Sequence, residues 1–323
     1  MNKIIIYMFL LGGLFSAKAN DLLEVESDCI WKNTDFEYFC DTCGCGGNGG
    51  SMGFGTGLNN NFVGLRYIGQ KYRSRDGIFD NSPWINENFN TVQAWGKFPV
   101  SKRVLLNALL PYHFHNRTFA DNTEQRIEGV GDATVLAYYL LLSQTPDSLV
   151  SIGAEHTLQI GGGVKVPTGS FDAANIEGTV NPSFQLGTGS WDYLFATNYG
   201  VVHRNWGLSA SVNYTLKTEN STNYQFGNQW NLTLNTYKTY YVSNTISLTP
   251  QVGLGSEIFS ENKEFGLKVS DTGGEVYFAR LGSETNYKRY SFGISSMLPI
   301  SQNLNNGKVE VKNRVSLYLN INI

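Results

Sequence analysis

The chain is poor in charged residues and contains no long hydrophobic run. Charged residues make up 16% of its 323 positions, against 41% hydrophobic and 13% aromatic residues. Little charge together with many aromatics excludes a disordered chain, which has the opposite balance. With 24 basic and 27 acidic residues, the chain is not a basic nucleic-acid-binding protein, and we expect no nucleic-acid partner. No apolar stretch approaches the roughly 18 residues that a membrane-spanning helix requires, which excludes a bundle of transmembrane helices.

These absences leave two classes of protein open. A soluble secreted β protein fits the slightly negative mean hydropathy of the chain. A transmembrane β-barrel fits it equally well, because a barrel strand needs an apolar side chain only at every second position. The alternation of side chains along the sequence decides between the two.

The first 19 residues have the parts of a secretory signal peptide. Lys3 supplies a positive charge, residues 4–15 form an apolar stretch too short to span a bilayer, and residues 17–19 match an A-x-A cleavage pattern. We therefore expect cleavage between Ala19 and Asn20, followed by export of the mature chain.

Residues 20–61 form a segment rich in cysteine and glycine. Every cysteine of the chain lies here, at Cys29, Cys40, Cys43 and Cys45. An even number of cysteines in an exported chain favours disulfides, here two, for which three pairings exist. The spacing C-x-x-C-x-C leaves a metal site open as the alternative, with thiolates around one Cu or Zn ion. We expect no other cofactor, and we expect this segment to lie in the periplasm or to plug a lumen.

Alternation with a period of two begins near residue 62 and continues to the end of the chain. On the last predicted strand, Val315, Leu317, Leu319, Ile321 and Ile323 share one face. The other face of this strand holds Arg314, Ser316, Tyr318, Asn320 and Asn322. In the earlier segments the polar face consists of Ser, Thr, Asn, Gln and Gly rather than Lys and Glu, which suits the packed interior of a barrel. The sequence therefore predicts an all-β fold, a transmembrane antiparallel β-barrel that occupies residues 62–323.

The candidate strands number twelve, and their connections alternate between short and long. They span residues 62–75, 89–100, 103–116, 128–142, 149–167, 191–203, 206–217, 225–238, 241–257, 274–281, 287–300 and 311–323. Short turns are expected at 101–102, 143–148, 204–205, 239–240 and 282–286. Short periplasmic turns and long extracellular loops are typical of barrels in the outer membrane of Gram-negative bacteria. Two ambiguous segments, at 128–142 and 180–189, leave a barrel of 14 strands as the alternative.

Three glycine-bearing motifs occur in a fixed order along the chain. They are Gly129-Val130-Gly131-Asp132, Lys165-Val166-Pro167-Thr168-Gly169-Ser170 and Gln185-Leu186-Gly187-Thr188-Gly189-Ser190-Trp191-Asp192. With them, the region from residue 62 to 323 resembles the outer-membrane barrel family associated with phenol-degradation operons, which is similar in style to long-chain fatty-acid channels. The segments 53–56 and 62–67 look more like a Bacteroidetes-type subgroup. The resemblance implies a transport barrel for small, often apolar molecules, and the Cys-rich N-terminal segment departs from the family pattern.

Charged and histidine side chains that strand parity directs inward are the candidates for lining the pore. They are Arg66, Lys97, Arg103, His113, His115, Glu155, Lys165, Asp192 and Arg314. Because both signs of charge are present, we expect no strong anion selectivity. His113 and His115 lie two residues apart on one strand face, where a polar lining and a metal pair are both open interpretations.

The sequence predicts an outer-membrane channel for a small solute, and not an enzyme; the family resemblance implies that such solutes are often apolar. No H-x-S-N-G string of a barrel phospholipase occurs, and we identify no catalytic residue. The expected partners are outer-membrane lipid, a small-molecule solute and the barrel-assembly machinery, which would recognise the C-terminal strand. The alternatives are a closed structural or binding barrel without transport, a barrel enzyme, and a soluble secreted sandwich.

Overall fold

The computed structural model describes residues 61–77, 81–144, 153–175 and 181–323. All of these residues belong to one compact unit of the chain, Asp35–Ile323. The described part contains no helix with the length and apolar character needed to cross a bilayer. The Cys-rich segment and the predicted cleavage site at Ala19 and Asn20 lie outside the described residues.

Twelve antiparallel strands form a closed barrel. They are β1 (Phe62–Arg75), β2 (Trp84–Ser101), β3 (Val104–Thr118), β5 (Ala133–Gln144), β6 (Glu155–Val166), β7 (Asp192–His203), β8 (Trp206–Lys217), β10 (Gln229–Lys238), β12 (Ile246–Phe259), β15 (Gly274–Tyr287), β16 (Tyr290–Leu304) and β17 (Val309–Asn322). Neighbouring strands in the sequence pair around the wall, and the pairing of β1 with β17 closes it. The short β11 (Tyr240–Ser243) pairs with the first residues of β12, and β10 pairs with the rest of β12. The predicted all-β barrel is thus confirmed, with twelve rather than 14 strands.

Two consecutive strands, β4 and β5, share one position in the wall. β4 (Glu124–Val130) pairs with the C-terminal half of β3, and β5 pairs with its N-terminal half. The two strands thus follow each other along β3 and are separated by Gly131 and Asp132. This explains the ambiguous pattern of the predicted segment 128–142, because one strand ends and another begins within it.

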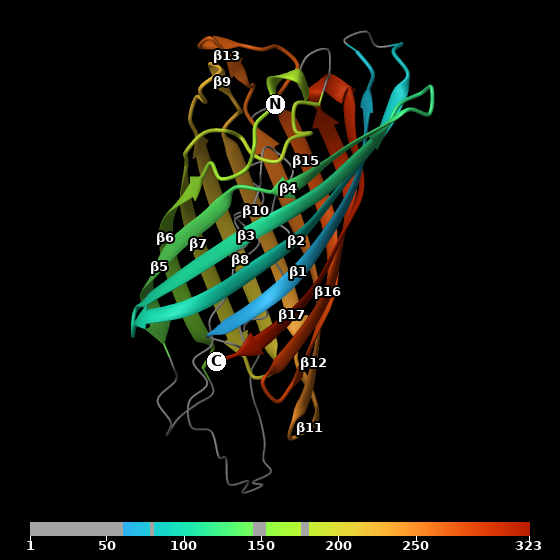
Figure 1. Cartoon of the computed structure of the whole chain (residues 1–323). Coiled ribbons are helices and arrows are strands. Elements are labelled where there is room, and N and C mark those ends of the chain that lie inside the picture. The colour runs from blue at the N-terminus through green and yellow to red at the C-terminus, as the bar shows by residue number, and fades with distance from the viewer. Residues whose placement is uncertain (1–60, 78–80, 145–152, 176–180) are drawn as a thin grey trace, which may run out of the picture. The chain divides into compact units, whose positions relative to one another are not determined.

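The long loops and the short turns lie at opposite ends of the barrel (Figure 1). At the long-loop end, β9 (Tyr224–Gln225), β13 (Lys263–Glu264) and β14 (Leu267–Lys268) form a small separate sheet. The C-terminus lies at the short-turn end, as expected for a barrel with periplasmic termini.

In the extracellular turn between β3 and β4, hydrogen bonds from Thr123 lower the pKa of the Asp121 carboxyl.

Two predicted turns are wrong. The turn expected at 239–240 lies instead between Ser243 and Ile246, and the turn expected at 282–286 lies between Tyr287 and Tyr290. In the second case Gly282 and Ser283 have the small polar character of a turn, yet they pair with Ser295 and Ile294 inside a continuous ladder. Small residues on an inward face therefore imitate turn residues when only the sequence is known.

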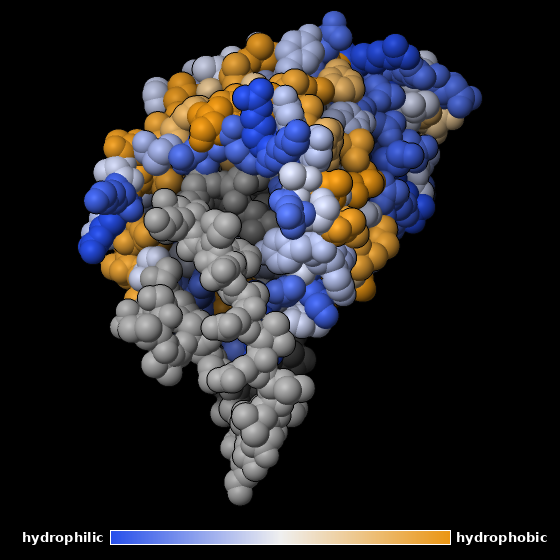
Figure 2. Space-filling view, turned by 90° about the horizontal axis from the view of Figure 1, so that it is seen from below, coloured by the Kyte–Doolittle hydropathy of each residue, from blue (hydrophilic) through white to orange (hydrophobic). Residues whose placement is uncertain are grey.

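The outer face of the strands carries a belt of exposed hydrophobic side chains. Figure 2, viewed from the short-turn end, shows hydrophobic residues around the barrel wall. The belt includes Leu65, Val92, Leu110, Phe195, Leu234, Val252, Phe292, Ile294, Leu317 and Leu319, all largely exposed. Such a surface is stable in lipid and not in water, so the fold is that of an outer-membrane barrel.

Candidate functional site

The connection between β6 and β7 is the longest between two wall strands, and its described parts are held against the barrel. It runs from residue 167 to 191 and contains a 3-10 turn at Ala173–Asn175. Asn181 Nδ2 donates to the buried Glu87 Oε2 of β2 at 2.6 Å. Asn175 Oδ1 accepts from Gln125 Nε2 of β4 at 2.9 Å. We call the described residues of this connection, 167–175 and 181–191, the inner segment.

A buried cluster of charges fixes both ends of the inner segment. Lys165 Nζ lies 2.5 Å from Asp192 Oδ2 and 3.3 Å from Asp132 Oδ2. It also donates to Thr188 Oγ1 at 2.8 Å. Asp132 accepts hydrogen bonds from the backbone nitrogens of Gly169, at 2.9 Å, and Thr188, at 2.8 Å. We call Asp132, Lys165, Thr188 and Asp192 the latch, since it joins β6 and β7 to the inner segment.

The latch leaves no room for side chains at two motif glycines. A Cβ on Gly187 would lie 2.4 Å from Asp132 Oδ1 and 2.6 Å from Gly169 O. A Cβ on Gly169 would lie 2.7 Å from Leu186 O. Gly169 and Gly187 therefore allow the inner segment to approach Asp132 closely enough for its backbone to donate to the carboxylate.

An apolar cluster inside the barrel contains Phe184 of the inner segment. Phe184 is fully buried at its centre. The cluster contains Ile68, Tyr72, Phe89, Phe184, Val276, Phe278, Met297, Leu304, Val309 and Val311. The ring of Phe184 meets that of Phe89 edge-on at 6.0 Å, and the guanidinium of Arg117 lies 4.5 Å from its centroid. These wall residues lie on five consecutive strands, β2, β1, β17, β16 and β15. Since the interior of a membrane barrel is normally polar, a buried apolar cluster on this part of the inner wall is a distinct feature of this chain.

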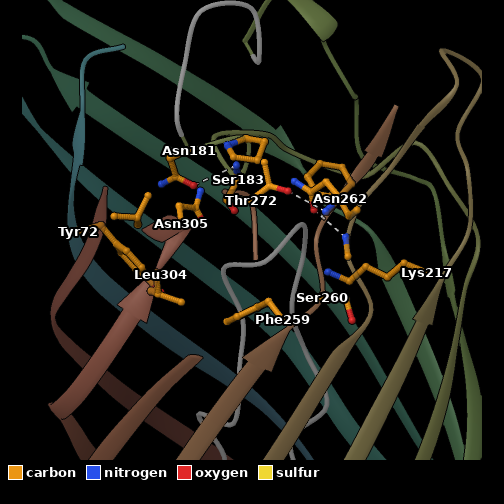
Figure 3. Close-up of a pocket in the computed structure, with 14 residues that line it drawn as sticks. Tyr72, Asn181, Ser183, Lys217, Phe259, Ser260, Asn262, Thr272, Leu304 and Asn305 are labelled. Carbon is orange, nitrogen blue, oxygen red and sulfur yellow. Dashed lines mark hydrogen bonds between the residues drawn. The ribbon is translucent and has the colours of Figure 1, made fainter. Parts of the chain in front are cut away.

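A small cavity lies beside this cluster (Figure 3). Tyr72, Phe259 and Leu304 line it with apolar surface, Lys217 enters from β8, and Asn181 and Ser183 belong to the inner segment. Its volume is about 50 Å³. A water molecule needs about 10–15 Å³ by the same measure, and a ligand pocket has about 300 Å³ or more. The cavity is large enough for a few water molecules and too small for an organic solute.

Two of the predicted inward-facing charges, Arg314 and Arg66, form hydrogen bonds with side chains of other strands inside the barrel. Arg314 binds Glu257 through two hydrogen bonds, at 2.5 and 2.9 Å, and also donates to Tyr72 Oη. β17 and β12 are separated by two strands, so the first contact spans part of the interior. Arg66 donates to Gln93 and lies 4.6 Å from the centroid of the Trp95 ring. Pairing keeps these buried charges from acting as open ion-binding groups.

The other predicted pore residues occupy different environments. Lys97 is buried on the inner face of β2, Glu155 begins β6 half-buried, and Lys165 and Asp192 belong to the latch. Arg103 lies outside the lumen, exposed in the turn before β3, where it donates to Tyr139 Oη. Strand parity placed Arg103 inside because the prediction began the strand one residue too early.

His113 and His115 are buried side by side on the inner face of β3, with ring centroids 4.7 Å apart. Thr91 Oγ1 is 2.8 Å from His113 Nδ1, and Asn90 N donates to His115 Nδ1 at 3.1 Å. Within the described ranges, no group of three His, Cys, Asp or Glu side chains suited to a metal ion occurs. The ring of His115 also meets those of Phe89, at 5.1 Å, and Phe184, at 6.4 Å, so the pair borders the apolar cluster described above.

Several interior residues were missed at the sequence level. Glu257 and Glu284 face inward, and the Tyr318 hydroxyl is hydrogen-bonded to Glu284. Parity would identify Glu257, whereas Glu284 was assigned to a turn. No periodic signal marks Phe184, because it lies in a long connection.

The sequence matches, over residues 86–296, a family described as "Putative MetA-pathway of phenol degradation". The chain belongs to this family. The resemblance found from the three motifs is thereby confirmed, and all latch residues lie within the matched region. No curated protein sequence matches this phenol-degradation family member significantly.

Two solved structures show the fold of this family member. An outer membrane channel from Pseudomonas putida F1 is 14% identical, with a TM-score of 0.55, over 80% of this chain and 95% of the channel. The β domain of the Bordetella autotransporter BrkA is 8% identical, with a TM-score of 0.51, over 82% of this chain and all of that domain. Both are similar in architecture, and at such identities the similarity extends to the fold alone.

Proposed function

We propose that the protein is an outer-membrane channel for a small solute with an apolar or aromatic body. The observation that carries this proposal is the apolar cluster around Phe184, which places aromatic and aliphatic side chains in the interior of a membrane barrel. An interior that only conducted ions and water would be lined by polar groups. An apolar lining binds the apolar part of a solute and desolvates it.

A second inward apolar patch supports the same solute class. It consists of Leu105, Leu136, Tyr138, Leu194 and Ala196, on β3, β5 and β7. Polar and charged residues lie on the inner faces around both patches, among them Arg66, Lys97, His113, His115 and Arg314. A solute with one apolar and one polar part finds partners for each along this lining.

The inner segment is the closing element of the proposed channel. Phe184 fills the cluster, the latch fixes both ends of the segment, and the neighbouring cavity has room for only a few waters. Passage of a solute then requires the inner segment to move away from the wall.

The test is transport by the purified full-length protein in liposomes and planar bilayers. Phenylalanine and glutamine are suitable probes, because both are zwitterions that cross lipid slowly and differ in the apolar part. We expect measurable conductance and faster uptake of phenylalanine than of glutamine, because only phenylalanine gains from the apolar lining. No conductance and no uptake of either would assign the protein to the closed structural barrels.

For the N-terminal segment, we propose that Cys29, Cys40, Cys43 and Cys45 form two disulfides. The even number of cysteines, all within one segment of a chain predicted to be exported, supports disulfide formation. We expect no free thiol and no bound metal in protein purified without reductant, by thiol titration and elemental analysis. One bound Cu or Zn per chain, with reduced cysteines, would establish the metal alternative.

We further propose that the barrel-assembly machinery recognises β17. Its outer face presents Leu317, Leu319 and Ile321 to the membrane, next to a C-terminus at the periplasmic end.

A further inference from the structure

A groove lies on the membrane-facing side of the barrel, next to the short turn between β2 and β3. Val104, Ala137, Tyr139, Ile160 and Gly162 line it, on the adjacent strands β3, β5 and β6 (Figure 1). Its volume is about 330 Å³. Tyr139 and Ile160, which flank it, are 41% and 45% exposed. The groove therefore opens toward the surrounding lipid and has an apolar surface.

The groove exists because two small residues pair on the outer face. Ala137 is opposite Gly162 in the ladder between β5 and β6. Gly162 is flanked by two glycines that the wall requires. A Cβ on Gly161 would lie 2.6 Å from the Tyr138 ring, and one on Gly163 would lie 2.3 Å from Val135 O.

Gly162 itself has no such local requirement. The nearest atom to a Cβ at this position is 3.9 Å away, an ordinary contact. A glycine inside a strand weakens the strand, since it contributes no side chain to packing. Because Gly162 has no side chain, the wall has a depression at this position.

The positively charged side chain of Arg103 lies next to Tyr139 at one end of the groove. Arg103, in the turn, donates from Nη1 to the hydroxyl of Tyr139 at 3.4 Å, and Tyr139 is a lining residue. Lys102, its neighbour in the turn, is also exposed. Leu106 pairs with Ala137, three residues after Arg103, so at about 3.4 Å per residue the groove reaches about 10 Å from the turn. It thus lies in the membrane leaflet nearest the short turns.

We propose that this groove binds one molecule of an anionic phospholipid. An acyl chain occupies the depression over Ala137 and Gly162, and the phosphate contacts Arg103 and Lys102. Two observations select this occupant: the groove opens into hydrocarbon, and its polar end carries two cations, which a phosphate complements. Tyr139 holds the Arg103 guanidinium beside the groove before the lipid binds, which lowers the entropy cost of binding.

The test is native mass spectrometry of the full-length protein in mild detergent, titrated with phosphatidylglycerol or phosphatidylcholine. We expect one phosphatidylglycerol to be retained, with at least severalfold preference over phosphatidylcholine. Gly162→Leu, which fills the depression, and Arg103→Gln, which removes the cation, are each expected to reduce retention severalfold.

Two matched variants serve as controls. Ala94→Leu enlarges an exposed residue elsewhere on the outer face, and Arg289→Gln removes another exposed turn arginine at the same end. Both should bind the lipid as the parent does. Equal retention by all four variants, or equal retention of both lipids, would refute the site. A dimer that Gly162→Leu abolishes would assign the groove to a second copy of the chain.

Heat-modifiable gel mobility shows which variants fold. Should Gly162→Leu fail to fold, Arg103→Gln decides the question, because Arg103 is an exposed turn residue outside the ladder. Neither outcome depends on whether the barrel transports a solute.

Discussion

Replacing Lys165 by methionine is expected to destabilise the barrel by about 3–5 kcal/mol, the usual cost of removing one partner from a buried ion pair. The side chains of Asp132 and Asp192 are 0% exposed, and Lys165 is the cation in contact with both. Methionine has a similar volume, so packing changes little, while two carboxylates remain buried without their shared ammonium. The Thr188 hydroxyl also loses its hydrogen bond from Lys165.

The measurement is the urea midpoint of unfolding in lipid vesicles, followed by heat-modifiable mobility. Lys71→Met is the matched control, because Lys71 is exposed on β1, and it should unfold as the parent does. Lys165→Met combined with Asp192→Asn should recover part of the loss, since one uncompensated charge is gone. A midpoint for Lys165→Met equal to that of Lys71→Met would show that the latch is not a stabilising element.

Replacing Phe184 by alanine is expected to raise single-channel conductance severalfold. The fully buried ring packs against Phe89 of β2, and its removal leaves a cavity close to the small one that the neighbouring Ser183 lines. A hydrophobic constriction conducts poorly because water leaves it, and widening it restores the water column. Planar-bilayer recording and the uptake of phenylalanine into liposomes measure the change.

A Phe→Ala change in a core costs about 3–5 kcal/mol, so folding must be checked in parallel. Phe184→Leu is the milder variant, and it should give a smaller increase in the same direction. Phe265→Ala is the matched control, because this phenylalanine of a long loop is 70% exposed. Conductance unchanged in both Phe184 variants, with wild-type mobility on gels, would exclude Phe184 as the closing residue.

Local alternation predicted the barrel and most of its strands. The predicted segments 62–75, 191–203 and 206–217 differ from β1, β7 and β8 by no more than one residue at either end. The predicted strand boundaries were less accurate where the inward-facing residues are small and polar, as at Gly282, because the same residues favour turns. The prediction also failed at Arg103, because the expected strand began one residue before β3 and strand parity was thereby applied to a turn residue.

The sequence by itself determined that the chain forms a membrane barrel, because lipid outside and packed side chains inside impose a period of two that is visible locally. It also determined that Arg66, Lys97 and Arg314 face inward. Only the tertiary structure decided that Arg314 meets Glu257, that three motifs converge on the latch, and that Phe184 packs into the apolar cluster inside the barrel. The physical reason is that parity gives a side chain its direction, whereas its partners depend on shear around the barrel and on the path of a loop, which no local pattern encodes.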